Sequence, residues 1–147
     1  MELLVVGRNN YSRFGEEVLL KVVVQAIPTY AMSCFKLPTT LCNQIESMMA
    51  NFSWGSTSFG NSIHWKNWNS LCKAKIHGGL GFRNFIHFNQ ALLGKQAWRL
   101  LEFPNSLLNR ILHHGYFLNG HFLRAKSGTC PSLTWKSIVW GNELLVK

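Results

Sequence analysis

The segment after Pro38 carries the strongest structural signal in the sequence, because its apolar residues recur with the period of an α-helix. The positions concerned are Leu41, Ile45, Met48, Met49 and Phe52, which fall at i, i+4, i+7, i+8 and i+11. This spacing places them along one side of a helix. We therefore predict an amphipathic helix that begins after Pro38, ends before Gly55 and buries these five side chains.

A second helix is predicted from near Gly15. Its segment Val18–Ile27 is apolar apart from Lys21 and Gln25, which lie four residues apart and so form one narrow polar stripe. A helix that is apolar on most sides is usually buried. The β-branched run Val22–Val24 leaves a strand as the alternative. A helix can also restart at Pro28, because proline is tolerated at the first helical position.

The second half of the chain predicts three more helices by the same reasoning. The first spans about Phe88–Glu102, the second follows a Ser106 cap, and the last spans about Leu133–Val146. In the first, the apolar surface comes from Leu92, Leu93, Ala97, Leu100 and Leu101. In the second, the side chains expected to pack inward are Leu107, Leu108, Ile111 and Leu112. In the last, they are Trp135, Ile138, Val139 and Leu145.

These patterns predict a mainly α fold, a small bundle of four to six helices. Between the helices lies a loop-rich middle segment that contains glycine and tryptophan, with a short helix at Leu71–Lys75 and a turn at Gly78–Arg83. A chain of 147 residues is long enough for one domain with its own core.

The charge balance is the first indication of function. Fifteen Lys and Arg face six acidic residues, all of them glutamate, and the formal net charge is +9. A basic surface attracts polyanions, chiefly through their phosphates. Improved solubility or a compositional bias of the genome would explain the same excess.

Catalytic chemistry finds little support. Two-metal phosphoryl transfer needs clustered carboxylates, whereas aspartate is absent and only Glu16 and Glu17 are neighbours. No nucleophile motif is present. A zinc site from His113, His114, His121 and Cys130 matches no standard spacing. Gly78–Gly81 lacks both phosphate-binding glycine patterns, so a tight turn is favoured over a phosphate cradle. We expect no catalytic residue, metal site, cofactor or small-molecule substrate.

The cysteines and the apolar segments bear on location. The four cysteines have no C-x-x-C spacing, which favours reduced thiols in an intracellular compartment. The run Leu3–Val6 is too short for a signal peptide, and Val22–Phe35 falls short of a membrane span. We expect a protein of the nucleus or cytoplasm, with the mitochondrion as an alternative, that is neither secreted nor bound to a membrane.

Aromatic and basic residues interleave between Trp65 and Arg83. Cations bind the backbone of a nucleic acid, while aromatic rings can stack on its bases. We expect Trp65 and Trp68 to belong mainly to the core and the cations to face the polyanion. The predicted backbone contacts, including three on the later helices, are Lys73, Lys75, Arg83, Lys95, Arg99 and Arg110.

Three long motifs resemble one family. VVQAIPTYAMSCFKLPTTLC (Val23–Cys42) resembles the region after the catalytic palm of plant non-LTR, LINE-type retrotransposon reverse transcriptases. IHWKNWNSLCKAKIHGGLGFRNFIHFNQALLGKQAWRLL (Ile63–Leu101) and PSLTWKSIVWGNELL (Pro131–Leu145) are similar to later segments of that family. The resemblance covers residues 12–147, whereas residues 1–11 do not match. Ala74 stands where the family usually has proline, Ser53 where an aromatic often precedes Trp54, and Lys136 replaces a common arginine.

The resemblance implies a fragment of the thumb and connection, one helical domain over residues 12–147. The paired aspartates of the palm lie upstream of the matching region in the family. The implied function is non-catalytic binding of a template–primer duplex or RNA. Two alternatives remain open: a protein-interaction module that docks on the missing palm domain, and a decayed relic of a retrotransposon with no function of its own.

Overall fold

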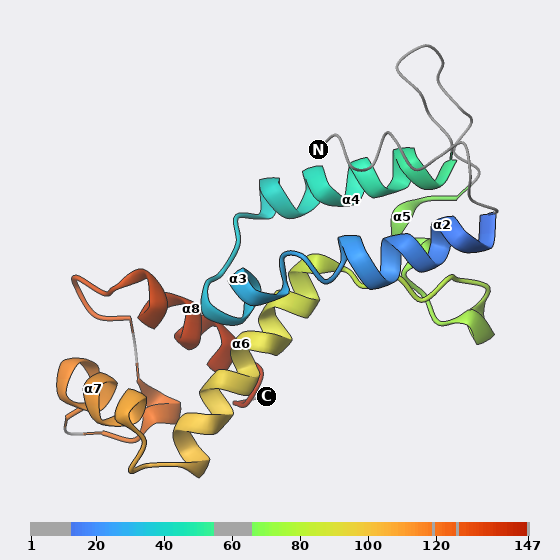
Figure 1. Cartoon of the computed structure of the whole chain (residues 1–147). Coiled ribbons are helices and arrows are strands. Elements are labelled where there is room, and N and C mark those ends of the chain that lie inside the picture. The colour runs from blue at the N-terminus through green and yellow to red at the C-terminus, as the bar shows by residue number, and fades with distance from the viewer. Residues whose placement is uncertain (1–12, 55–65, 119, 126, 147) are drawn as a thin grey trace. The chain divides into compact units, whose positions relative to one another are not determined.

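The computed structural model describes residues 13–54, 66–118, 120–125 and 127–146. Within these ranges the chain forms seven α-helices and three shorter helical turns, and no strand is present (Figure 1). The predicted mainly α class is therefore confirmed. The helices outnumber the expected four to six because the segment between Pro28 and Pro38 forms a helix of its own. The short helix predicted at Leu71–Lys75 lies earlier in the chain and ends at Leu71, and a 3-10 helix begins at Lys75.

The contacts divide the chain into two compact units. Unit 1 holds the described residues of Met1–Pro28 and Pro38–Phe85, and unit 2 holds those of Thr29–Leu37 and Ile86–Lys147. The elements of unit 1 are α2 (Arg13–Leu19), the π-helix η2 (Leu20–Val24), α4 (Thr39–Trp54), α5 (Trp68–Leu71) and the 3-10 helix η3 (Lys75–His77). The prediction of one domain over residues 12–147 stays a prediction.

Helix α4 confirms the predicted element but faces the core with a different side. Met49 and Phe52 are buried as predicted, whereas Leu41 and Met48 are exposed. Their places in the core are taken by Cys42 and Glu46, each one position along the chain from a predicted core residue. The buried side of α4 is thus shifted by roughly one residue from the predicted side. The reason is that Glu46 turns inward to accept a hydrogen bond from the backbone N–H of Phe85 at 2.8 Å.

The helix near Gly15 is present, but the prediction that its apolar sides are buried is wrong. Val18, Val22 and Ile27 are 47%, 65% and 74% exposed, whereas the polar Gln25 is 2% exposed. The π-helical turn explains this outcome. The Gln25 N–H donates to the Leu20 carbonyl five residues earlier, which aligns these two residues on the buried side and turns the valines outward.

Unit 2 is built from α3 (Thr29–Cys34), α6 (Phe85–Glu102), α7 (Leu107–Tyr116), the 3-10 helix η4 (Phe122–Arg124) and α8 (Leu133–Asn142). Helix α6 begins three residues before the predicted start, and α8 ends before the predicted Val146. Ser106 caps α7 as predicted, since its side chain accepts a hydrogen bond from the backbone N–H of Asn109 at 3.3 Å.

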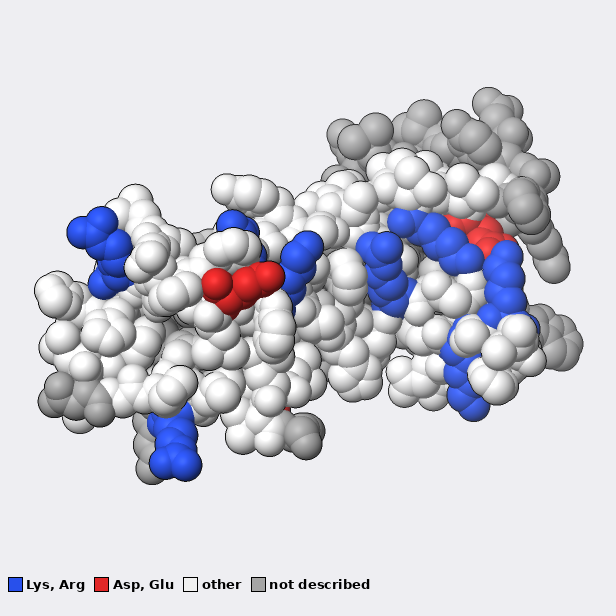
Figure 2. Space-filling view, turned by 90° about the horizontal axis from the view of Figure 1, so that it is seen from below, with Lys and Arg blue, Asp and Glu red and all other residues white. Residues whose placement is uncertain are grey.

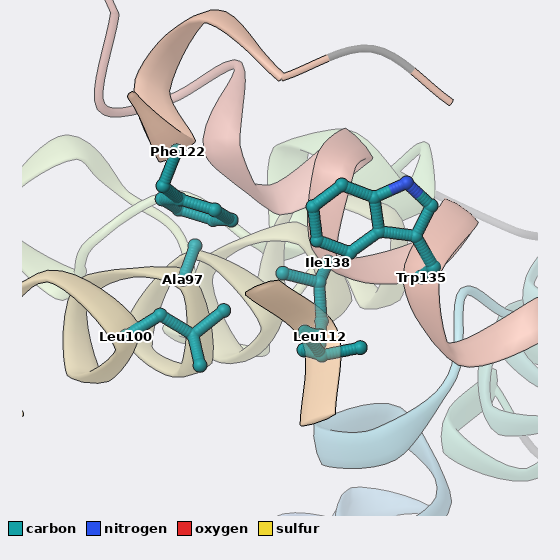
Figure 3. Packing of buried hydrophobic residues seen from close by; sticks show 6 residues of the cluster. All are labelled: Ala97, Leu100, Leu112, Phe122, Trp135 and Ile138. Atoms are coloured by element: carbon teal, nitrogen blue, oxygen red, sulfur yellow. The ribbon is translucent and has the colours of Figure 1, made fainter. Parts of the chain in front are cut away.

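The core of unit 2 is a cluster contributed by four elements. Ala97 and Leu100 come from α6, Leu112 from α7, Phe122 from η4, and Trp135 and Ile138 from α8 (Figure 3). Trp135 is fully buried and stacks on Tyr116 with ring centroids 4.7 Å apart. The prediction that Ala97 and Leu100 of α6 and Trp135 and Ile138 of α8 face the core is therefore confirmed.

Helix α7 departs from the prediction. Of its four predicted core residues only Leu112 is buried, whereas Leu107, Leu108 and Ile111 are exposed. The buried side of the helix is instead Asn109 and Leu112. The Asn109 amide donates to the Pro104 carbonyl at 2.8 Å, and this bond fixes the rotation of the helix just after its first turn.

Candidate nucleic-acid interface

The glycine turn of unit 1 is rigidly hydrogen-bonded. Gly78 and Gly81 have φ values of 73° and 72°, in the left-handed region that favours glycine. Gly79 is needed for a different reason, because a Cβ atom there would lie 2.1 Å from the Lys73 carbonyl oxygen. The turn therefore packs directly against the backbone of Lys73 and fixes the course of the chain on both sides of it.

The hydrogen bonds of this turn decide whether it is a phosphate cradle or a tight structural turn. The backbone N–H groups of Gly78, Gly79, Leu80 and Gly81 donate to the carbonyls of Lys75, Ala74, Leu71 and Lys73 at 3.1, 3.2, 2.9 and 2.9 Å. A phosphate cradle needs such donors to point at the ligand. Because all four are used within the turn, it is a structural turn that presents side chains.

The side chains that the glycine turn and its flanking residues present are cationic. Lys73, Lys75 and Arg83 are exposed and lie before, within and after the turn region. Phe82, next to Arg83, is buried and stacks on Trp68 with centroids 5.0 Å apart, so Arg83 projects from a well-packed neighbour. Trp68 is a core residue, as predicted, whereas Trp65 lies outside the described residues.

One acid lies among these cations. The Glu17 carboxylate pairs with Lys21 at 2.6 Å and with Lys75 at 3.2 Å. The hydrogen bond from Lys21 holds the pKa of Glu17 below its ordinary value, against the opposing effect of burial, and Lys75 lowers that pKa further. Lys21 also donates to the Leu80 carbonyl, and Lys66 donates to the Gly78 carbonyl at 3.0 Å. Lys21 and Lys66 thus hold the turn, whereas Lys75 keeps a side chain that is 65% exposed.

The other three predicted contacts belong to unit 2. Lys95 and Arg99 are exposed on α6 one helical turn apart, and Arg110 is exposed on α7. No ion pair joins these three side chains to a carboxylate of the described residues. Arg110 lines a surface groove together with His113 and His114. Figure 2 shows Lys and Arg side chains at the surface, with acidic side chains beside some of them. The structure therefore groups the six predicted residues three to a unit.

Two of the carboxylates have structural partners. Glu46 is buried and accepts from Phe85, and Glu17 is held between two lysines. In the described parts of the chain, no three His, Cys, Asp or Glu side chains come together in a way that could hold a metal ion. None of the helices in those parts is both long enough and apolar enough to span a membrane. The four cysteines are free thiols.

Comparison with known proteins gives two relatives in Arabidopsis thaliana. One is named "Uncharacterized mitochondrial protein AtMg00310" and is 46% identical over 121 residues, which are 82% of this chain and 79% of the relative. This chain belongs to the family of that mitochondrial protein. The other, "Putative ribonuclease H protein At1g65750", is 35% identical over 131 residues, which are 86% of this chain and only 21% of the relative. No family model and no solved structure matches the chain.

These relatives bear on the family resemblance drawn from the sequence. The AtMg00310 protein has about the length of this chain, whereas the At1g65750 protein contains a similar segment within a much longer chain. The relatives support a plant protein related to retroelements. The finer assignment to a reverse transcriptase is a proposal.

One exposed side chain escaped the sequence analysis. Trp98 lies on α6 between Lys95 and Arg99 and is 55% exposed, whereas Trp68 and Trp135 are buried. The signal was present in the sequence. Trp98 follows Lys95 by three residues and precedes Glu102 by four, so helical spacing places it on the same side of the helix as these two charged residues and away from the core.

Proposed function

We propose that the chain is a non-catalytic nucleic-acid-binding segment, equivalent to the thumb and connection of a LINE-type reverse transcriptase. The observation that carries the proposal is the set of exposed cations that the fold holds in place. Lys73, Lys75 and Arg83 flank a turn whose backbone is fully hydrogen-bonded, and Lys95 and Arg99 lie on one regular helix. Cations on rigid elements contact phosphates without first being ordered.

The carboxylates support a role without catalysis. Phosphoryl-transfer sites hold two metal ions with adjacent acids. In unit 1, Glu17 is engaged in ion pairs with two lysines, and Glu46 accepts a hydrogen bond from the backbone N–H of Phe85. The resemblance assigns the metal-binding aspartates to a palm upstream. In this proposal the chain holds the duplex while another domain supplies the chemistry.

The test is binding to a labelled primer–template duplex over a series of salt concentrations. If all six predicted cations contact phosphates, the logarithm of the association constant should fall with log salt at a slope of about −5. The double variant Lys95→Gln/Arg99→Gln should bind more weakly and reduce that slope by about 2. The charge-matched control is Arg124→Gln/Lys136→Gln, because both side chains are exposed in unit 2 and outside the predicted set.

The control distinguishes a site from a general charge effect. If both double variants lose the same affinity and the same slope, binding depends on net charge alone, and the proposed contacts are wrong. If the unaltered chain shows no binding that depends on salt, the proposed function is wrong.

The exposed side of α2 and η2 favours a second candidate function. Val18 of α2, Val22 of η2 and Ile27, which follows η2, are exposed apolar side chains in a strongly basic chain, and large exposed apolar surfaces mark sites where proteins meet. In the second proposal these side chains dock on the palm domain of the parent protein. A purified palm domain from a related retroelement should bind the chain, and Val22→Ser/Ile27→Ser should abolish that binding.

A matched control separates the two functions. Leu133→Ser changes an apolar residue of α8 that is 61% exposed, and it should leave palm binding unchanged. Duplex affinity should be the same in all these variants. The remaining alternative, a decayed relic, predicts no cooperative thermal unfolding of the purified chain.

A further inference from the structure

Trp98 is the described tryptophan that lies most open to solvent, at 55% exposure. The opposite side of the same helix turn is buried, since Ala97 and Leu100 belong to the core cluster of unit 2. The indole therefore contributes little to the packing of unit 2. A single exposed apolar residue is common in proteins, so exposure by itself indicates no function.

The neighbours of Trp98 distinguish it from an ordinary exposed residue. On a helix, side chains three or four positions apart have Cβ atoms about 5–6 Å apart. Lys95 precedes Trp98 by three residues, and Arg99 follows it directly. Both cations are exposed and neither forms an ion pair with a described carboxylate. On α6, the exposed ring of Trp98 thus has Lys95 one turn before it, Glu102 one turn after it, and Arg99 as the next residue along the helix.

We propose that Trp98 stacks on an unpaired base and that α6 thereby binds a single-stranded stretch of nucleic acid. Stacking on a ring requires a base whose face is accessible, which a base inside a duplex does not offer. Lys95 and Arg99 bind the phosphates on either side of the stacked base. The proposal rests on the proposed nucleic-acid-binding function and specifies its ligand as a single strand or a single-stranded overhang.

The chemistry of this face favours a nucleic acid over a protein partner. Charged residues such as Lys and Glu are rare at the centre of protein–protein interfaces. Around Trp98 the helix positions at −3, +1 and +4 are Lys95, Arg99 and Glu102, all of them charged and exposed. An exposed aromatic ring with Lys95 one turn before it and Arg99 next to it combines the two features that bind single strands with little dependence on sequence.

The test compares two fluorescein-labelled DNA duplexes, one blunt and one with a short overhang of thymidines, by fluorescence anisotropy at fixed salt. The unaltered chain should bind the overhang duplex about tenfold more tightly than the blunt one. Trp98→Leu should abolish that difference and leave the affinity for the blunt duplex unchanged. Trp98→Phe should keep most of it, because a phenyl ring still stacks. Circular dichroism checks that each variant is folded.

A matched control removes a different exposed apolar side chain from the same unit. Leu107→Ala on α7, where Leu107 is 71% exposed, should leave both affinities unchanged. Equal affinity of the unaltered chain for the two duplexes, or a full preference retained by Trp98→Leu, overturns the stacking proposal while the proposed function stands. An equal loss on both duplexes also overturns it. Failure to bind either duplex overturns the proposed function and the stacking together.

Discussion

At the scale of single residues, the four cysteines occupy unlike environments. Cys130 is exposed, whereas Cys72 is half-buried behind the glycine turn. Burial, together with the nearby carboxylate of Glu46, raises the pKa of the Cys72 thiol to about 11. The thiolate is the reactive form, so accessibility and pKa act together to make Cys72 inert.

We expect iodoacetamide at pH 8 to alkylate Cys130 quickly and Cys72 at least tenfold more slowly, as followed by peptide mass spectrometry. With a pKa of about 11, only about one thousandth of Cys72 is thiolate at that pH. The modification rate of Cys72 should keep rising with pH above 9. Equal alkylation rates for the two cysteines in the folded chain would contradict the half-buried position and raised pKa of Cys72.

Ala74 is a departure from the family pattern that the backbone makes testable. Its φ of −59° and ψ of 153° match the geometry that proline imposes. No hydrogen bond from its N–H is found among the described residues. A proline there would lower the entropy of the unfolded chain without removing a native bond.

Ala74→Pro is therefore expected to stabilise the chain by about 0.4–1 kcal/mol in chemical denaturation. The control is Ala91→Pro, which places the ring inside α6 and should destabilise by about 3 kcal/mol or more. A loss of stability in Ala74→Pro would mean that the N–H or the preceding residue is more constrained than its geometry indicates.

At the scale of the elements, one side chain fixes the segment that contains α3. The Asn89 amide donates to the carbonyls of Met32 and Phe35 at 2.7 and 2.9 Å, and its oxygen accepts from the Leu37 N–H at 2.9 Å. These bonds satisfy the end of a short helix that could not be stable alone. Ser137 adds a fourth bond, accepting from the Lys36 N–H at 2.8 Å.

Asn89→Leu should lower the free energy of unfolding by about 3 kcal/mol, because it leaves two carbonyls and one N–H buried without partners. The matched control is Asn43→Leu on α4, at an exposed position where the change should be within about 0.5 kcal/mol. Urea denaturation followed by circular dichroism measures both. An equal, small effect in the two variants would show that water replaces the bonds of Asn89.

The elements also show what the sequence could and could not predict. Periodicity located α4, α6 and α8, because each has an apolar side that repeats with the helical period. It failed to orient α2, α4 and α7, since their rotation depends on Gln25, Glu46 and Asn109, polar residues that are buried by bonds to the backbone. The role of Asn89 depends on residues more than fifty positions away, which no local pattern contains.

The candidate interface was predictable to a similar degree. Residue type and the excess of charge selected the six cations, and all six are exposed. What the sequence did not contain was the pairing of Lys75 with Glu17, which requires a contact between residues far apart in the chain. Trp98 was overlooked because a tryptophan is expected in a core, although its helical position already placed it on the polar side with Lys95 and Glu102.

At the scale of the whole molecule, the net charge of +9 should make stability and binding respond to salt in opposite directions: added salt should raise the melting temperature and weaken the affinity for the duplex. Surplus like charges repel one another and destabilise the compact state, and salt screens this repulsion, since the Debye length falls from about 30 Å at 0.01 M to about 10 Å at 0.1 M. Against it act only two ion pairs in the described residues, both made by Glu17. Surface ion pairs contribute little.

The melting temperature should therefore rise by a few degrees between 0.01 and 0.2 M sodium chloride, as measured by circular dichroism, over the same range in which affinity for the duplex falls. Glu17→Gln should enlarge the rise, because it removes the acid that partly neutralises Lys21 and Lys75 and makes the repulsion among the cations stronger at low salt. The control Glu143→Gln, at an exposed position at the end of α8, removes one negative charge without breaking an ion pair and should enlarge the rise less. A melting temperature that falls with salt would mean that the Glu17 pairs outweigh the repulsion. The cations would then be held in place mainly by Glu17 rather than by the hydrogen-bonded turn, and a bound phosphate chain would have to compete with that carboxylate.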